Sequence, residues 1–152
     1  FVDNIRYVDN ANEELDAVGK IDLRHEAVAD KTFKSILGDS KKQSETSIVK
    51  ITAYQPNKLT YEVNSDQGGI VVFSENYYPE WTATVDGKDV PVGRVNYILR
   101  AIQVKPGKHT VVLSFYPKSV STTETIAYVA MGVLVLLLIA AIIYEGKKRK
   151  KA

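Results

Sequence analysis

The longest run of hydrophobic positions in the chain covers residues 126–144, IAYVAMGVLVLLLIAAIIY, and contains no charged side chain. At about 1.5 Å per helical residue, these 19 positions span roughly 28 Å, close to the hydrocarbon thickness of a bilayer. The alternative is a buried core helix, but such a helix usually carries a polar stripe and this run has none. The pattern therefore predicts one transmembrane helix.

From residue 47 onward the pattern changes to the two-residue period of β-strands. Leu59, Tyr61 and Val63 alternate with polar neighbours, as in a strand with one buried face. Residues 70–75 are nearly all apolar, which predicts a central strand. Further strands are expected at residues 47–55, 81–85, 95–104 and 108–116.

Two dipeptides mark the turns of this region. Asp86-Gly87 predicts a type I′ hairpin, because both central residues of that turn need positive φ. Pro106-Gly107 suits a type II turn. Several short strands at such spacing predict an antiparallel β-sandwich over residues 47–118. The expected fold is mainly β, an antiparallel β-sandwich followed by one C-terminal transmembrane helix.

Residues 1–46 form a mixed segment that we expect to pack on the β-domain. Asn10 can cap a short helix that Gly19 ends. Residues 38–46 are polar and rich in turn formers, so a loop is expected there.

The charge of the chain is uneven. Removing the five basic charges of residues 147–151 from the net charge of +2 leaves −3 for residues 1–146. Basic flanks of a membrane span stay in the cytoplasm, so residues 145–152 are predicted to form a cytoplasmic tail and the β-domain to be extracytoplasmic. The lipid bilayer is the expected partner, and the mildly acidic remainder argues against nucleic acid. The absence of cysteine excludes disulfides and thiolate metal sites.

A search for catalytic chemistry finds little. None of the common nucleotide, hydrolase or metalloprotease motifs is present, so we predict no catalytic residues, no metal site and no cofactor. The two histidines, His25 and His109, are interpreted as surface residues with near-normal pKa. A carboxylate pair could be assembled from residues near the Asp86-Gly87 hairpin, but acidic residues are favoured there for backbone reasons. The candidates for such a pair are Glu75, Glu80, Asp86 and Asp89.

Aromatic residues cluster beside polar donors in two neighbouring stretches. The candidate binding residues are Tyr77, Tyr78, Tyr97 and Arg100. Aromatic faces pack on the apolar faces of sugars, while a guanidinium meets hydroxyls or phosphates, so a glycan or lipid head group is the candidate ligand.

A structural interpretation of the same cluster stays open. Trp81 starts an alternating strand and is the only tryptophan, which favours a place in the core. The tyrosines would then cover the sheet edge, and Arg100 would pair with Glu75 or Asp86. On position alone, we expect Trp81 to be mainly buried and Arg100 to be exposed.

Several stretches resemble one bacterial family. They are AYQPNKL at residues 53–59, VFSENYYP at 72–79, WTATVDG at 81–87, NYILRA at 96–101 and PGKH at 106–109, with YVDNANEE at 7–14. Together they resemble the C-terminal region of YfhO-type membrane proteins. One departure is Glu80, which stands where that pattern commonly has glycine before the tryptophan.

The resemblance implies a large polytopic protein of the type-C glycosyltransferase kind in the bacterial cytoplasmic membrane. Such proteins move sugars from polyprenyl-phosphate carriers to envelope polymers, and their catalytic acid belongs to a loop near the first helices. The chain would then be an accessory β-domain with the last transmembrane helix, and its partners would include the remaining helices of the parent protein. The alternative is a non-enzymatic, membrane-anchored module of the cell envelope that binds a glycan or a protein.

Overall fold

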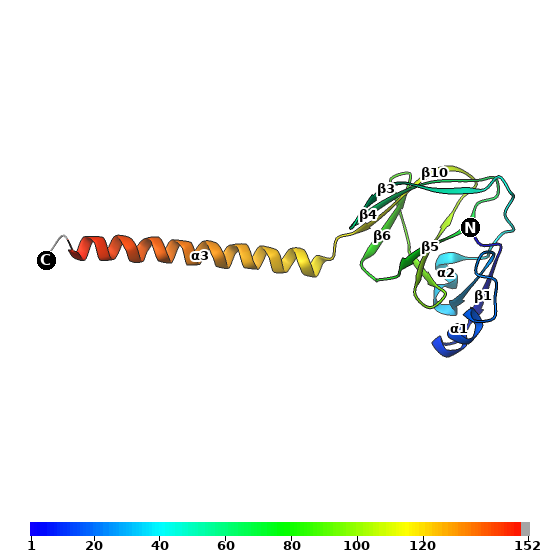
Figure 1. Cartoon of the computed structure of the whole chain (residues 1–152), viewed down its shortest axis with the longest axis horizontal. Coiled ribbons are helices and arrows are strands. Elements are labelled where there is room, and N and C mark those ends of the chain that lie inside the picture. The colour runs from blue at the N-terminus through cyan, green and yellow to red at the C-terminus, as the bar shows by residue number, and fades with distance from the viewer. Residues whose placement is uncertain (150–152) are drawn as a thin grey trace. The chain divides into compact units, whose positions relative to one another are not determined.

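The computed structural model describes residues 1–149, except for the side chains of residues 118, 119, 121, 145, 148 and 149. The last part of the predicted basic tail, residues 150–152, lies outside the described residues. The chain divides into two compact units, Phe1–Phe115 and Tyr116–Ala152. Figure 1 shows the first unit as a β-rich domain and the second as a long helix, and each is treated separately below.

Five antiparallel strands form the larger sheet of the first unit. They are β3 (Ile48–Gln55), β4 (Lys58–Ser65), β10 (Gly107–Phe115), β6 (Trp81–Val85) and β7 (Lys88–Val90), in that order across the sheet. The last strand in sequence, β10, therefore lies in the middle and pairs with β4 on one side and β6 on the other.

The smaller sheet has three antiparallel strands. They are β5 (Gly69–Asn76), β9 (Leu99–Val104) and β8 (Gly93–Val95), in that order. Its inward side chains meet those of the larger sheet in one core, which is the expected sandwich packing. The main contributors are Leu59, Val63, Val111 and Leu113 from the larger sheet and Val71, Phe73, Ile102 and Val104 from the smaller one.

The prediction of a central strand at residues 70–75 is wrong in one respect. Strand β5 lies at the end of the three-stranded ladder and has only β9 as a full neighbour, with one isolated bridge from Val2 to Ile70. Its residues are apolar because both of its faces are covered. Val71 faces the sandwich core, whereas Ile70 faces a second core on the opposite side.

The N-terminal segment supplies that second layer. It contains a parallel pair, β1 (Asn4–Val8) and β2 (Glu26–Asp30), which the sequence did not predict. Helix α1 (Ala11–Val18) connects them, and the 3-10 helix η1 (Lys31–Phe33) and helix α2 (Lys34–Leu37) follow. The second core comprises Val2, Ile5, Ala27, Ala29, Leu37, Ile70, Val95 and Ala101.

Local signals at the ends of α1 act as predicted. The side-chain oxygen of Asn10 accepts a hydrogen bond from the Glu13 amide at 3.0 Å, which satisfies one of the free donors at the helix start. Gly19 follows the last helical residue.

Two turns contain consecutive residues in the left-handed backbone region. Asp86 and Gly87 have φ of 51° and 76°, as the predicted type I′ hairpin between β6 and β7 requires. Asn96 and Tyr97 also have positive φ, 50° and 71°, and they break the single strand expected at residues 95–104 into β8 and β9.

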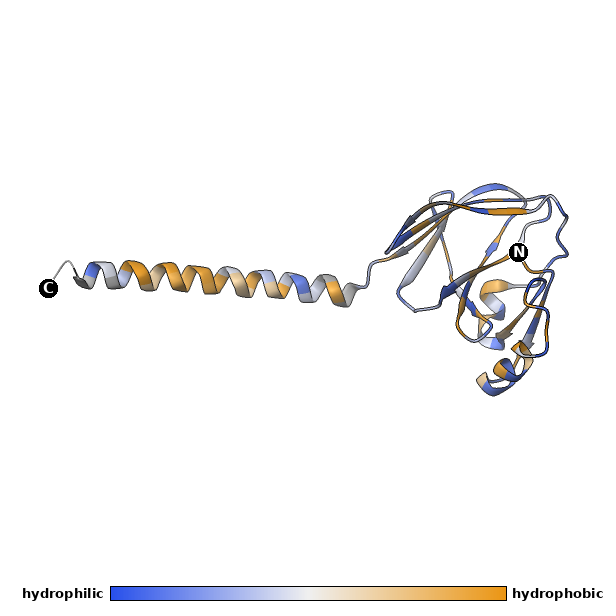
Figure 2. Ribbon diagram, viewed as in Figure 1, coloured by the Kyte–Doolittle hydropathy of each residue, from blue (hydrophilic) through white to orange (hydrophobic). Residues whose placement is uncertain are grey.

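The second unit is dominated by helix α3 (Lys118–Arg149). Its segment Thr122–Tyr144 is long and apolar enough to cross a membrane. Figure 2 shows this stretch as hydrophobic along most of its length, with hydrophilic residues near its start. None of this segment is buried, which disfavours the alternative of a core helix. The predicted fold class, an antiparallel β-domain with one C-terminal apolar helix, is confirmed.

Candidate functional site

Arg100 is the most deeply buried of the predicted binding residues. It precedes Ile102 and Val104 at two-residue spacing on β9, so it shares their inward face. Its exposed fraction is 1%. The guanidinium Nη2 donates to Glu75 Oε2 at 3.1 Å, and burial lowers the pKa of Arg100 while Glu75 opposes that shift. The expectation of an exposed Arg100 is therefore wrong, and the alternative of a pair with Glu75 is confirmed.

The ring of Trp81 covers this guanidinium. The ring centroid lies 3.7 Å from the guanidinium carbon, a close cation–π contact. Trp81 is half-buried at the margin of the sandwich core, where it also packs on Phe115 with 5.2 Å between ring centroids. Within the described residues, Nε and Nη1 of Arg100 have no hydrogen-bond partner. Contact with the indole face therefore partly compensates these nitrogen atoms for the loss of hydration.

The three tyrosines lie in two adjacent turns. The Tyr77 amide donates to the carbonyl of Ile98 at 2.6 Å, which joins the turn after β5 to the turn before β9. Tyr77 is half-buried edge-on against Phe33, whereas Tyr78 and Tyr97 are exposed. The structure thus brings the tyrosine turns together but keeps the Arg100 guanidinium between the sheets. As a ligand surface, Tyr77, Tyr78, Tyr97 and Arg100 remain a prediction.

The departure from the family pattern at Glu80 has little consequence for the backbone. Among the described non-glycine residues, positive φ occurs at Asp86, Asn96 and Tyr97, so Glu80 is outside the left-handed region. A glycine is not required here for its conformational freedom.

A buried carboxylate holds the Asn96-Tyr97 turn in place, and no sequence signal pointed to it. Glu14 on α1 is completely buried and accepts from Arg94 Nη2 at 2.9 Å and from the Tyr97 amide at 2.8 Å. Asn96 Oδ1 accepts from the Val28 amide at 2.9 Å. These bonds join residues about seventy to eighty positions apart, so they are visible only once the chain is folded.

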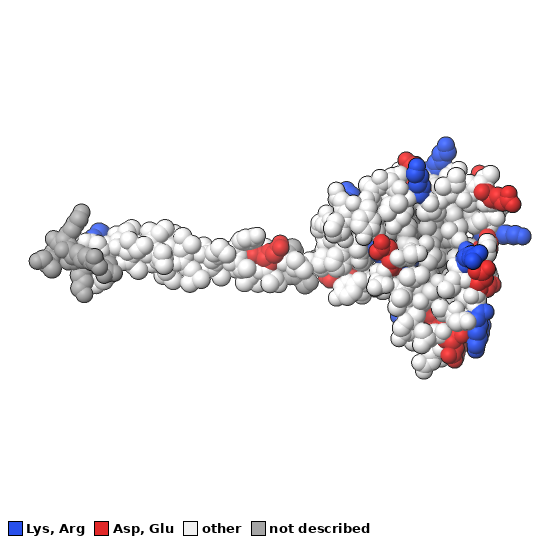
Figure 3. All heavy atoms as spheres, viewed as in Figure 1, with Lys and Arg blue, Asp and Glu red and all other residues white. Residues whose placement is uncertain are grey.

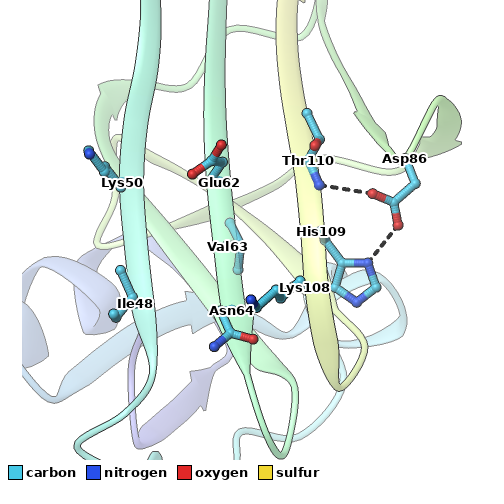
Figure 4. A pocket seen from close by; sticks show the side chains of 9 residues that line it. All are labelled: Ile48, Lys50, Glu62, Val63, Asn64, Asp86, Lys108, His109 and Thr110. Carbon is cyan, nitrogen blue, oxygen red and sulfur yellow. Dashed lines mark hydrogen bonds and ion pairs between the residues drawn. The ribbon is translucent and has the colours of Figure 1, made fainter.

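An open hollow of about 590 Å³ lies on the larger sheet, away from the aromatic turns. Figure 4 shows the lining side chains spread over β3, β4 and β10, with Asp86 beside β10. Its lining combines ammonium, carboxylate, amide and hydroxyl groups with one exposed aliphatic side chain. The residues are Ile48, Lys50, Glu62, Val63, Asn64, Asp86, Lys108, His109 and Thr110. Within the described residues, neither lysine of the hollow forms an ion pair.

A histidine–carboxylate pair forms one wall of this hollow. His109 Nδ1 lies 2.6 Å from Asp86 Oδ2, and the Thr110 amide donates to Asp86 Oδ1 at 2.8 Å (Figure 4). The bond to Asp86 raises the pKa of His109, and the carbonyls of Lys105 and Pro106 near Nε2 add to this effect. The same bond lowers the pKa of Asp86. The expectation of a near-normal pKa is therefore wrong for His109.

Two of the carboxylates considered for an acid–base pair are held in structural bonds. Asp86 is held by His109 and Thr110, and Glu75 is paired with Arg100, so neither is an isolated acid facing an open site. Among the side chains that the structure describes, no group of three or more potential metal ligands occurs. Figure 3 shows acidic and basic side chains interspersed on the visible face of the β-domain, without a single-sign patch.

Comparison with known protein families decides the broader assignment. The family model described as bacterial membrane protein YfhO matches residues 19–146, which is most of the chain. The chain belongs to the YfhO family. The predicted resemblance is confirmed, and membership of a membrane-protein family together with the apolar segment of α3 supports association with a lipid bilayer. No curated protein and no solved structure matches the chain.

Proposed function

We propose that this YfhO-family chain is the extracytoplasmic accessory domain and last transmembrane helix of a polytopic membrane protein. The parent protein transfers sugars from polyprenyl-phosphate carriers to envelope polymers, and the hollow of Figure 4 holds the acceptor polymer. In this proposal the β-domain faces the outside and residues 145–152 lie in the cytoplasm, because basic flanks are retained on that side.

The observation that carries the proposal is the chemistry of the hollow. Lys50 and Lys108 offer ammonium donors, Glu62 offers acceptors, and Asn64 offers both. Such a mixture suits a polymer rich in hydroxyls and bearing anionic substituents. The exposed Ile48 at one side can pack against the apolar face of a sugar ring.

Attachment to the membrane supports the same proposal. Strand β10 ends at Phe115 and the apolar segment starts at Thr122. The intervening residues 116–121 reach at most about 20 Å even when fully extended. An acceptor held by the β-domain would therefore stay close to the bilayer, where a lipid-linked sugar donor resides.

The alternative is a non-enzymatic envelope module that binds a glycan or a protein. Glu75 is bonded to Arg100 and Asp86 to His109, so neither carboxylate is free to act as an acid or base. This observation favours the non-enzymatic module. The alternative predicts the same glycan binding but no dependence of sugar transfer on the hollow.

The test is glycan binding by the whole chain in lipid nanodiscs, measured by calorimetry with neutral and phosphate-bearing fragments of envelope polysaccharide. Lys50→Ala and Lys108→Ala should each weaken binding of the anionic fragment about tenfold, because each removes a charge-assisted hydrogen bond. Lys20→Ala, an exposed lysine outside the hollow, is the matched control and should bind like the parent. If the unmodified chain binds no fragment, or if Lys20→Ala weakens binding as much as the hollow variants do, the hollow is not the glycan-binding site.

The role in sugar transfer needs the parent protein. Lys50→Ala and Lys108→Ala introduced there should reduce transfer to polymer while leaving hydrolysis of the lipid-linked donor unchanged. Glycan binding by the hollow with unaltered transfer would favour the non-enzymatic alternative.

A further inference from the structure

The two ends of the β-sandwich carry different side chains. At one end the chain leaves the domain at Phe115, and three turns lie at this end of the sandwich. The Phe115 amide donates to the carbonyl of Asn57 at 2.9 Å, which places the turn at residues 55–58 beside it. Tyr78 packs on Phe115 with 5.9 Å between ring centroids, and the Tyr77–Ile98 hydrogen bond adds the turn at residues 96–98. We call these three turns, residues 54–58, 77–80 and 96–98, the exit end.

The exit end is rich in exposed apolar side chains. The exposed fractions are 68% for Tyr54, 55% for Tyr78, 52% for Ile98 and 39% for Tyr97. At the opposite end, the turns at residues 65–68, 86–87 and 105–107 contain none of the exposed large hydrophobic side chains among the described residues. Ile48, which lies toward that end on β3, lines the hollow instead.

Burial explains why these side chains are not simply part of the core. Trp81 and Phe115 close the sandwich at the exit end, and Arg100 fills the space beneath the indole. Tyr54, Tyr78 and Ile98 are not part of this closure and are exposed. Large apolar side chains gathered on a surface usually mark an interaction site.

We propose that the exit end is a lipid-contact surface, which rests in the head-group region of the bilayer crossed by Thr122–Tyr144. Tyrosine rings suit this region because the ring is apolar and the hydroxyl remains hydrated. The short stretch from Phe115 to Thr122 limits the distance of the exit end from the bilayer and imposes no such limit on the opposite end.

The charge of the exit end specifies the kind of lipid. Its turns contain one basic residue, Lys58, and one acidic residue, Glu80. The contact is therefore apolar and interfacial, and it requires neither anionic lipid nor low ionic strength. This inference concerns the orientation of the domain on the membrane and does not depend on the proposed glycan site.

The test uses the whole chain in phosphatidylcholine nanodiscs that contain a nitroxide label on a fraction of the head groups. Because the chain has no cysteine, Ile98→Cys and Lys105→Cys each provide a single site for a fluorophore, at the exit end and the opposite end respectively. We expect strong quenching of the label at position 98, little at position 105, and the same result at high salt. Equal quenching at both positions, or no quenching at 98, would overturn the proposal.

A second comparison separates contact from mere proximity. The chain's only tryptophan, Trp81, lies at the exit end and serves as an internal reporter. Replacing Tyr54 and Tyr78 by serine in the Ile98→Ser background should abolish quenching of Trp81 by the head-group nitroxide. The matched control replaces three exposed residues of the opposite end by serine, Asp66, Gln67 and Lys105, and should leave quenching unchanged. If the exit-end variant keeps the parent's melting temperature and its quenching, the side chains do not make the contact.

Discussion

The guanidinium carbon of Arg100 lies 3.7 Å from the centroid of the Trp81 ring, and this contact joins the two sheets of the sandwich. Arg100 belongs to β9 in the three-stranded sheet, whereas Trp81 starts β6 in the five-stranded sheet. A charged group at 1% exposure is costly unless it is compensated. Here the ring above and the carboxylate of Glu75 beside it provide that compensation.

Truncation of the covering ring should therefore be costly. We predict that Trp81→Ala destabilises the β-domain by about 3 kcal/mol, at the lower end for a buried aromatic because the ring is only half-buried. Tyr78→Ala, at an exposed neighbour, is the control and should change stability by no more than about 0.5 kcal/mol. Urea unfolding followed by near-ultraviolet circular dichroism measures both. Equal midpoints for Trp81→Ala and the parent would show that the ring does not close this end of the core.

The ion pair between Arg94 and Glu14 should respond unequally to removal of its two partners. The Glu14 side chain is completely buried, whereas that of Arg94 is 26% exposed. Arg94→Met leaves a buried carboxylate with only the Tyr97 amide as a partner and should cost about 3–5 kcal/mol. Glu14→Gln keeps the size and an acceptor for the Tyr97 amide, so its cost should be smaller. Thermal melts of the two variants compare them directly, and a larger loss for Glu14→Gln would contradict the assignment.

Gly93 is predicted to tolerate no side chain. A Cβ at this position would lie 2.7–2.9 Å from the side-chain carbons of the fully buried Leu37. Gly93→Ala should therefore destabilise the domain by about 1–3 kcal/mol through overpacking of the second core. Gly19→Ala is the matched control, since the nearest atom to its Cβ is 3.9 Å away and its φ is −69°. Denaturant midpoints give the answer, and equal effects at the two glycines would argue against the packing of α2 on β8.

The His109–Asp86 pair makes stability depend on pH in a defined direction. The folded-state pKa of His109 is raised above 6.5, so its contribution is complete below that value and is lost as pH rises through the folded pKa. The pKa of Asp86 is lowered below 3.8, so its contribution is present above that value and is lost as pH falls through the folded pKa. The pair therefore stabilises the fold most between these two limits.

We expect the melting temperature of the unmodified chain to fall between about pH 6 and pH 8, and His109→Gln should remove this fall. His25→Gln leaves the His109–Asp86 bond intact and should preserve that fall. The check is a series of melts in buffers of matched ionic strength. If the melting temperature of His109→Gln still falls over this pH range, a group other than His109 causes the pH dependence.

The orientation of the chain in the membrane is a further prediction. Single cysteines at Lys105, in the β-domain, and at Ala152, in the basic tail, should react differently with an impermeant thiol reagent in intact cells. We expect labelling at position 105 and none at position 152, because basic flanks remain in the cytoplasm. The reverse pattern would invert the topology.

Local signals predicted the parts of the fold that depend on few residues. The Asp86-Gly87 turn, the Asn10 cap and the apolar run in α3 each arise from the properties of neighbouring residues, so the sequence alone was sufficient. The antiparallel strands followed from their two-residue period in the same way.

Features that depend on distant contacts were missed. The parallel pairing of β1 with β2 has no signal in either strand. Tyr97 takes positive φ because Glu14, 83 residues away, binds its amide. For Arg100 a signal was present in its two-residue spacing from Ile102 and Val104, but the expectation of exposure, which was based on position, did not use that spacing. The hollow could not be predicted from the sequence, because its lining residues come from four separate stretches of the chain.

The central place of β10 in the larger sheet has a mechanical consequence. This strand is hydrogen-bonded to β4 on one side and β6 on the other, and its last residue leads into the unit that carries the apolar helix α3. Tension on the chain would enter the domain through β10, and extraction of this strand would have to break two rows of hydrogen bonds, one to β4 and one to β6. An edge strand in the same role could be peeled away one bond at a time. The domain is thus joined to the second unit through a strand that is held on both sides.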